Sequence, residues 1–304
     1  MGKLLDTIDH REIIASLNQP QKAELTARSD MPALLRLLAH GGLLLILGAA
    51  IAAKVPLWPL LLLPHGILLI FLFTPLHETI HATAFRTPVL NRLVAAICGF
   101  LVFIPPVWFG YFHFAHHRHT HHPDHDPELQ RPKPRTIWQY AATLSGIPFW
   151  LSMVRVITLN ACRPTLETFV PQKARRKVTM EARFYLAAYL LVAVLSLAAG
   201  SDAAIWLWVV PALIGQPFLR AYLLAEHTLC PHVVNMLQNT RTTFTNQIVR
   251  FIAWNMPYHA EHHAFPVVPF HKLPEFHKHV RAHLAETERG YVRFQARLLK
   301  TFAQ

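Results

Sequence analysis

Four long apolar stretches constrain the fold of this chain more than any other feature. They are residues 34–53, 55–74, 184–199 and 203–224. A transmembrane helix needs about 20 predominantly apolar residues, and the membrane interior accepts only helices and closed barrels. Only 15% of the residues are charged, whereas roughly a quarter are charged in soluble domains. We therefore predict an all-α, polytopic membrane protein.

The four stretches pair into two hairpins. Lys54 alone separates the first two stretches, and residues 200–202 separate the last two. Of the 29 Lys and Arg residues, only Lys54 lies in these short turns. Basic residues gather on the cytoplasmic side of membrane proteins, so we expect both termini and the active site to be cytoplasmic. The gathering of Lys and Arg on one side of the membrane explains the net charge of +12. No nucleic-acid partner is therefore expected.

Two interrupted apolar stretches, residues 93–109 and 137–159, fall outside this count. We expect both to be interfacial or re-entrant helices, because a single additional span would place the histidine clusters on opposite sides of the membrane. The predicted organisation is a cytoplasmic N-terminal segment (1–33), a membrane domain (34–274) with a cytoplasmic helical cap that holds the histidines, and a cytoplasmic C-terminal helix (275–304).

The chain contains 21 histidines, and many of them follow helical spacing. HETIH begins at residue 77, HFAHH at residue 113 and HAEHH at residue 259. Residues three and four apart share one face of a helix, and imidazole is the commonest protein metal ligand. Pro257 can open the last of these helices, and Pro266 and Pro269 can close it. The nine candidate metal ligands are His77, His81, His113, His116, His117, His227, His259, His262 and His263.

The order of these motifs around two membrane hairpins resembles the membrane-bound fatty acid desaturase family, from about residue 34 to residue 274. The resemblance implies that the nine histidines hold two iron ions and that O₂ is a co-substrate. It further implies desaturation of an unactivated C–H pair, in a fatty acyl chain or another lipid that enters an apolar tunnel. Some relatives have an asparagine one turn before the histidine that corresponds to His227, and Leu223 stands there in this chain.

Several side chains near the motifs have two interpretations. Five carboxylates either accept a hydrogen bond from the second nitrogen of a ligand histidine or are ordinary surface groups: Asp124, Asp126, Glu128, Glu226 and Glu261. His119, His121, His122 and His125 are assigned lower weight, as outer, loop or alternative ligands. His271, His277, His279 and His283 are expected on a solvated helical face. The aromatic residues Phe71, Phe73, Phe100, Phe103, Trp108 and Phe109 either line the tunnel or serve as packing residues.

Other functions remain open at this stage. A hydroxylase or ketolase could act on a lipid, a carotenoid or a small amphipathic metabolite with the same scaffold. His77, Glu78 and His81 also match the H-E-x-x-H motif of zinc proteases, in which the glutamate is the general base. A transporter or metal-storage protein is a further alternative, although it should carry ionisable groups across its spans.

The electrons for an O₂-dependent reaction must come from elsewhere. The sequence has no fused haem-binding or ferredoxin-like segment and no glycine-rich dinucleotide fingerprint. We therefore expect an external electron donor, such as a ferredoxin, a rubredoxin or a cytochrome with its reductase. The basic cytoplasmic surface suits an acidic donor.

Overall fold

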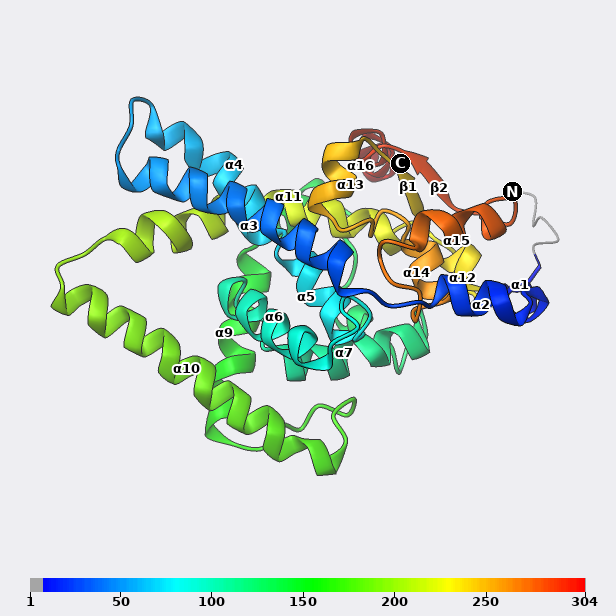
Figure 1. Ribbon diagram of the computed structural model, residues 1–304, viewed down its shortest axis with the longest axis horizontal. Coiled ribbons are helices and arrows are strands. Elements are labelled where there is room, and N and C mark those ends of the chain that lie inside the picture. Colours follow the sequence, from blue (N-terminus) through cyan, green and yellow to red (C-terminus); the bar gives the residue numbers. More distant parts are fainter. Residues whose placement is uncertain (1–7, 304) are drawn as a thin grey trace.

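The computed structural model describes residues 8–303 and is mostly helical, with few residues in strands (Figure 1). The α-helices are α1 (His10–Ser16), α2 (Gln19–Leu25), α3 (Asp30–Ala52), α4 (Trp58–Ile70), α5 (Phe73–Ile80), α6 (Pro88–Leu101), α7 (Pro106–His119), α8 (Ile137–Ser145), α9 (Ile147–Cys162), α10 (Arg175–Ala198), α11 (Val210–His227), α12 (Met236–Asn239), α13 (Gln247–Ile252), α14 (His259–Ala264), α15 (Leu273–Val280) and α16 (Tyr291–Lys300). Shorter helical segments are η1 (Pro127–Gln130), η2 (Gln172–Ala174), the π-helix η3 (Ile205–Val209) and η4 (Thr301–Ala303). Two strands, β1 (Thr242–Phe244) and β2 (Thr287–Arg289), pair in parallel. The all-α prediction is confirmed apart from this small ribbon.

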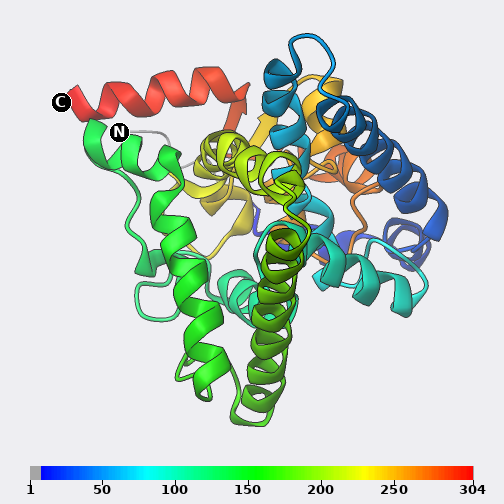
Figure 2. The same ribbon diagram turned by 90° about the vertical axis from the view of Figure 1, so that its left-hand side faces the viewer.

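Four helical segments are long and apolar enough to cross a membrane, as the sequence predicted. They are Gln19–Ala52, Trp58–Ile80, Gln172–Ala198 and Ile205–His227. Figures 1 and 2 show that the segments form two hairpins, and in Figure 1 both hairpin tips lie at the end of the molecule away from α14 and α15. The first segment includes both α2 and α3, with a short non-helical break between Leu25 and Asp30. The prediction of four spans in two hairpins is confirmed.

The two interrupted stretches form bent helix pairs. The chain bends by 99° between α6 and α7 and by 52° between α8 and α9. Pro105 and Pro106 lie at the first bend, where a proline cannot donate the backbone hydrogen bond that a continuous helix needs. Gly146 lies at the second bend with a φ of +71°, a conformation that glycine adopts without strain. Such bends fit the re-entrant or interfacial arrangement expected from the sequence.

The two hairpins meet where α4 crosses α11. A Cβ atom on Gly215 would lie 2.1 Å from the carbonyl oxygen of Gly66, and one on Gly66 would lie 2.3 Å from the carbonyl oxygen of Pro211. Neither glycine can therefore carry a side chain without moving the backbone. This close contact fixes the second span against the fourth and brings the histidine-bearing ends of α5 and α11 together.

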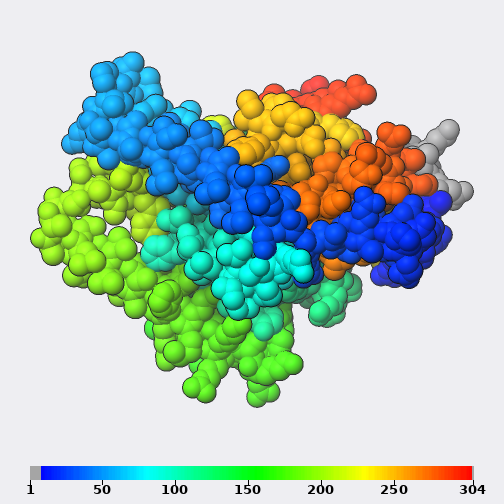
Figure 3. Space-filling model, in the orientation of Figure 1, coloured from blue at the N-terminus to red at the C-terminus, as the bar shows by residue number. Residues whose placement is uncertain are grey.

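The segment after residue 274 differs from the single helix that the sequence predicted. It contains the end of α15, then β2, and then α16. Gly290, with a φ of +97°, separates the strand from the last helix, and β2 pairs with β1 from Thr242 opposite Thr287. Figure 3 shows the orange residues of this region packed beside the dark blue N-terminal helices, where α1 contacts α15.

Candidate metal centre

Four parts of the fold bring the nine predicted histidines together. Helix α5 carries His77 and ends at His81, α7 carries the second motif, α11 ends at His227, and α14 carries the third motif. One cluster, here called the five-histidine group, consists of His77, His81, His113, His117 and His262. One ligand atom from each lies within 4.8 Å of the others.

The second cluster lies beside the first and contains the remaining four histidines. His116, His227 and His263 place their ligand atoms within 4.8 Å of one another. The Nε2 atom of His259 lies 3.2 Å from the Nε2 atom of His227, so His259 joins the same cluster. These residues are called the four-histidine group below.

The nitrogen positions fit two metal ions. Two imidazole nitrogens that are each about 2.1 Å from one ion lie about 3 Å apart. His113 Nε2 lies 2.9 Å from His117 Nε2, and His116 Nε2 lies 3.1 Å from His227 Nε2. His77 and His262 each bury both ring nitrogens without a hydrogen-bond partner. Such burial is costly unless something else binds the nitrogens, and a metal ion in the five-histidine group would bind one nitrogen of each ring.

Burial also favours the neutral, metal-binding form of these imidazoles, except at His116, where Glu128 and Asp126 outweigh burial and raise the pKa. Burial lowers the pKa of His81 to about 3. Burial and the neighbouring His116 together lower the pKa of His259 to about 3. Both groups therefore contain rings that are neutral at pH 7, and only a neutral imidazole can donate a lone pair to a metal.

In the four-histidine group, every ring has an oxygen atom near its outer nitrogen. His116 Nδ1 donates a hydrogen bond of 3.0 Å to Asp126. The same carboxylate accepts hydrogen bonds from the backbone N–H groups of His121 and Glu128, so its position is fixed. The other contacts are His263 with Thr120 at 3.3 Å, His227 with the carbonyl of Asn239 at 3.4 Å, and His259 with Glu226 at 3.5 Å. Such contacts select the tautomer and orient a ligand ring.

Of the five candidate carboxylates, Asp126 and Glu226 contact a ligand ring, and the other three do not. Glu261 instead accepts hydrogen bonds from Thr242 and His277, each at 2.5 Å. The prediction that His277 lies on a solvated face is therefore wrong, because this ring ties α15 to the third histidine motif. Glu128 pairs with Lys133 at 3.2 Å, and Asp124 contacts the neighbouring ring of His122 through its backbone N–H.

The four histidines of lower weight stay outside both groups in the described part of the chain, residues 8–303. His121 is buried and donates a hydrogen bond of 2.9 Å to the carbonyl of Asn239, and burial lowers its pKa to about 4. The rings of His119, His122 and His125 lie next to one another. Their density in the sequence therefore overstated the number of ligands in this loop.

The protease interpretation of the first motif does not match the position of its glutamate. Glu78 is fully buried and accepts a hydrogen bond of 3.0 Å from the backbone N–H of Phe270. Its side chain does not line the pocket beside the histidines. A general base must reach the substrate or its attacking water, and this carboxylate instead holds the chain after α14 in place.

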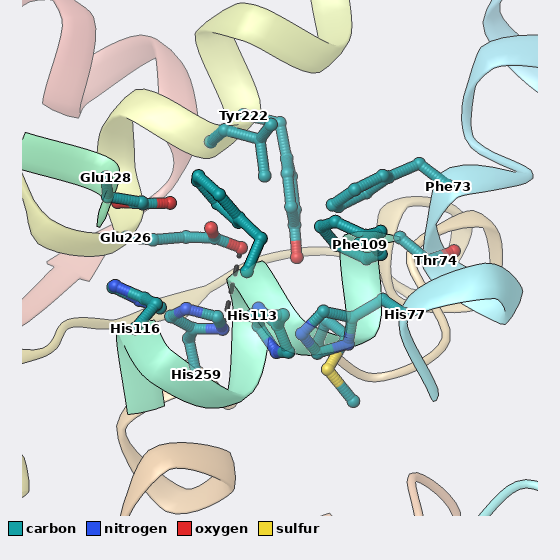
Figure 4. Close-up of a pocket in the computed structure, with 13 residues that line it drawn as sticks. Phe73, Thr74, His77, Phe109, His113, His116, Glu128, Tyr222, Glu226 and His259 are labelled. Carbon is teal, nitrogen blue, oxygen red and sulfur yellow. Dashed lines mark ion pairs between the residues drawn. The ribbon is translucent and has the colours of Figure 1, made fainter. Parts of the chain in front are cut away.

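A pocket opens beside both histidine groups (Figure 4). Its lining combines His77, His113, His116 and His259 with apolar Phe73, Phe109, Phe112, Leu223 and Met256 and with polar Thr74, Glu128, Tyr222 and Glu226. Among the aromatic residues predicted for a tunnel, only Phe73 and Phe109 line it. Phe100 and Phe103 instead stack on Trp208.

Sequence reasoning missed the contributions of Tyr222, Phe112 and Met256 to the pocket. Tyr222 lies four residues before Glu226 on α11, so its place on the same helical face as that carboxylate was an available signal. Phe112 and Met256 each lie close to a histidine motif in sequence, but apolar residues next to a motif are too common to single out.

Comparisons with known proteins agree with this site. The family model described as fatty acid desaturase matches residues 52–295. A sphingolipid delta(4)-desaturase from Komagataella phaffii (strain GS115 / ATCC 20864) is 25% identical over 214 residues, which cover 66% of this chain and 55% of the relative. The chain thus spans about half the length of this curated relative. All three histidine motifs lie inside the residues that the family model matches.

Proposed function

We propose, from the premise that this chain belongs to the fatty acid desaturase family, that it is an O₂-dependent di-iron oxidoreductase that desaturates an unactivated C–H pair in a fatty acyl chain or another lipid. The observation that carries the proposal is the separation of nine buried or half-buried histidines into two adjacent groups. The relative is named for a sphingolipid, which supports a lipid substrate.

The histidines would hold the iron through neutral nitrogen donors, five in one group and four in the other. Iron bound there would supply the redox chemistry that activates O₂. The chain's own residues orient the rings, and Asp126 fixes His116 in the tautomer that leaves Nε2 free for the metal. The apolar wall of the pocket, which includes Phe73 and Phe109, excludes water from the reacting carbons.

The overall reaction balances only with an external reductant. Removal of two hydrogens from adjacent carbons forms one C=C bond, and two electrons and two protons complete the reduction of O₂ to two water molecules. We propose that the electrons come from a separate ferredoxin, rubredoxin or cytochrome with its reductase. The net charge of +12 favours an acidic donor, and the distribution of Lys and Arg supports a cytoplasmic orientation of both termini and the site.

Metal analysis combined with lipid profiling tests this proposal. The purified protein should contain two iron atoms per chain, whereas a protease of the H-E-x-x-H class would contain one zinc. Cells that carry the gene should accumulate a lipid with one additional double bond compared with cells that lack it. A new hydroxyl or keto group in its place would assign the chain to the oxygenating branch of the same chemistry, and unchanged lipids and metabolites would contradict both assignments.

A further inference from the structure

The pocket beside the metal centre has a polar corner that a plain hydrocarbon chain does not need. We propose that the substrate carries a hydrogen-bond donor, a hydroxyl or amino group, close to the carbons that are oxidised, and that Glu226 and Tyr222 bind this group. The inference rests on the proposed function, because it names the substrate class of the same site.

Glu226 is the first part of the argument. Its side chain is only 11% exposed, and its carboxylate lies 3.5 Å from Nδ1 of His259. Figure 4 shows it on the wall of the pocket, joined to His259 by the dashed line. A buried carboxylate requires donors for its oxygen atoms, and the ring at 3.5 Å and the nearby Tyr222 hydroxyl leave part of this capacity unused. A methylene chain has no donor to offer.

Tyr222 is the second part. Its side chain is buried, and the hydroxyl lies near Glu226 and Tyr291 without making a hydrogen bond of ordinary geometry. Tyr222 and Glu226 are four residues apart on α11, so both side chains project from one face of the helix. Together they offer an acceptor that is negatively charged when ionised and a hydroxyl that can donate or accept.

Glu128 provides an internal contrast within the same pocket. It also lines the pocket, but Lys133 donates to its carboxylate at 3.2 Å. In the described part of the chain, one of the two pocket carboxylates thus forms an ion pair with a lysine, whereas Glu226 lies beside the ring of His259 and the hydroxyl of Tyr222 and forms no ion pair with Lys or Arg. This difference points to Glu226 as the carboxylate whose remaining partner comes with the substrate.

The location of the polar corner fixes where oxidation takes place. Glu226 contacts one nitrogen of His259, and the other nitrogen of that ring lies 3.2 Å from His227 in the four-histidine group. A substrate group held by Glu226 is therefore separated from the metal-binding nitrogens by about the width of the His259 ring. The carbons next to that group are the ones that face the centre.

Binding of chain-matched probes tests the inference. Decan-1-ol and decylamine carry a donor, whereas methyl decanoate has the same chain with acceptors only. Affinity is measured by isothermal titration calorimetry on the iron-loaded protein in lipid nanodiscs, with empty nanodiscs as the partition control. We expect at least one donor probe to bind severalfold more tightly than methyl decanoate, as one additional buried hydrogen bond provides.

The variants Tyr222→Phe and Glu226→Gln should each reduce that preference severalfold. Matched controls are Tyr140→Phe, whose hydroxyl donates to Gln295 outside the pocket lining, and Glu128→Gln, whose carboxylate already has Lys133. Both controls should retain the preference. If Glu226→Gln fails to fold, Tyr222→Phe carries the test, because it removes only one oxygen atom.

The possible outcomes separate this inference from the proposed function. Preference for decylamine alone would identify an amine, and preference for both donor probes would show that a hydroxyl suffices. Equal affinity for methyl decanoate, or a preference unchanged in Tyr222→Phe and in a folded Glu226→Gln, would overturn the inference while the iron content stays at two. Wild-type protein that binds no iron would instead overturn the proposed function.

Discussion

The two histidine groups use the same ligand but differ in what lies behind the rings. In the four-histidine group, the outer nitrogens face oxygen atoms, of which Asp126 at 3.0 Å from His116 is the closest. In the five-histidine group, the neighbours are aromatic: Phe73 beside His77, Phe109 beside His113 and Phe114 beside His81. One group is oriented by polar contacts and the other by packing, so two metal ions bound here would be chemically inequivalent.

The largest expected effect comes from removing one ligand of either group. His262→Ala in the five-histidine group and His116→Ala in the four-histidine group should each abolish product formation and iron loading, because the reaction needs both ions. Iron per chain and product yield measure the effect. His279→Ala is the matched control outside both groups, and full activity in either ligand variant would contradict the assignment.

A smaller effect is expected from the carboxylate behind the four-histidine group. Asp126→Asn keeps the shape but weakens the acceptor of His116, and loss of such an outer contact costs about 10–100-fold in metal affinity. Iron should be lost from one site before the other during titration with a chelator. Asp124→Asn, in which the side chain contacts no ligand histidine, should behave like the wild type. Simultaneous loss of both irons in Asp126→Asn would show that the groups do not differ in this way.

Thr120→Val should have a still smaller effect. The Thr120 hydroxyl lies 3.3 Å from His263 and also donates to the carbonyl of His116, so its loss removes one neutral contact, about 1 kcal/mol or roughly fivefold in affinity. The measurement is the same chelator titration. Thr143→Val, on a helix that carries none of the ligands, is the control, and a change larger than that of Asp126→Asn would reverse the ranking.

The smallest effect is expected from mild acid. His81 and His259 belong to different groups, yet burial lowers the pKa of each to about 3. Protons should therefore compete little with iron in the five-histidine group between pH 8 and pH 6, and its iron affinity should change less than about twofold. In the four-histidine group the loss should be larger, because Glu128 and Asp126 outweigh burial and raise the pKa of His116. The unfolded chain takes up protons near pH 6.5, so the stability of the iron-free fold should decline below that pH. A steep loss of iron from the five-histidine group with a midpoint near pH 6.5 would contradict the burial of His81.

The spans and the clustering of the candidate histidines were predictable from sequence because each follows from local periodicity. Twenty apolar residues form a span whatever surrounds them, and histidines three and four apart share a helical face. The outer contacts were harder to predict. Asp126 lies ten residues from His116 and Asn239 lies twelve residues from His227, and only the folded loops bring them together.

The C-terminal region shows the same limit. Its sequence predicted one helix, but pairing between β1 and β2 replaces part of it, and no local pattern specifies a partner more than 40 residues away. His277 appeared solvated for a similar reason, because its bond to Glu261 joins α15 to α14.

Mössbauer spectroscopy of protein loaded with ⁵⁷Fe tests the central claim most directly. Two inequivalent sites predict two quadrupole doublets of equal area, together accounting for two iron atoms per chain, and Asp126→Asn should shift only one of them. A single doublet, or a protein that retains one zinc and no iron, would contradict the account.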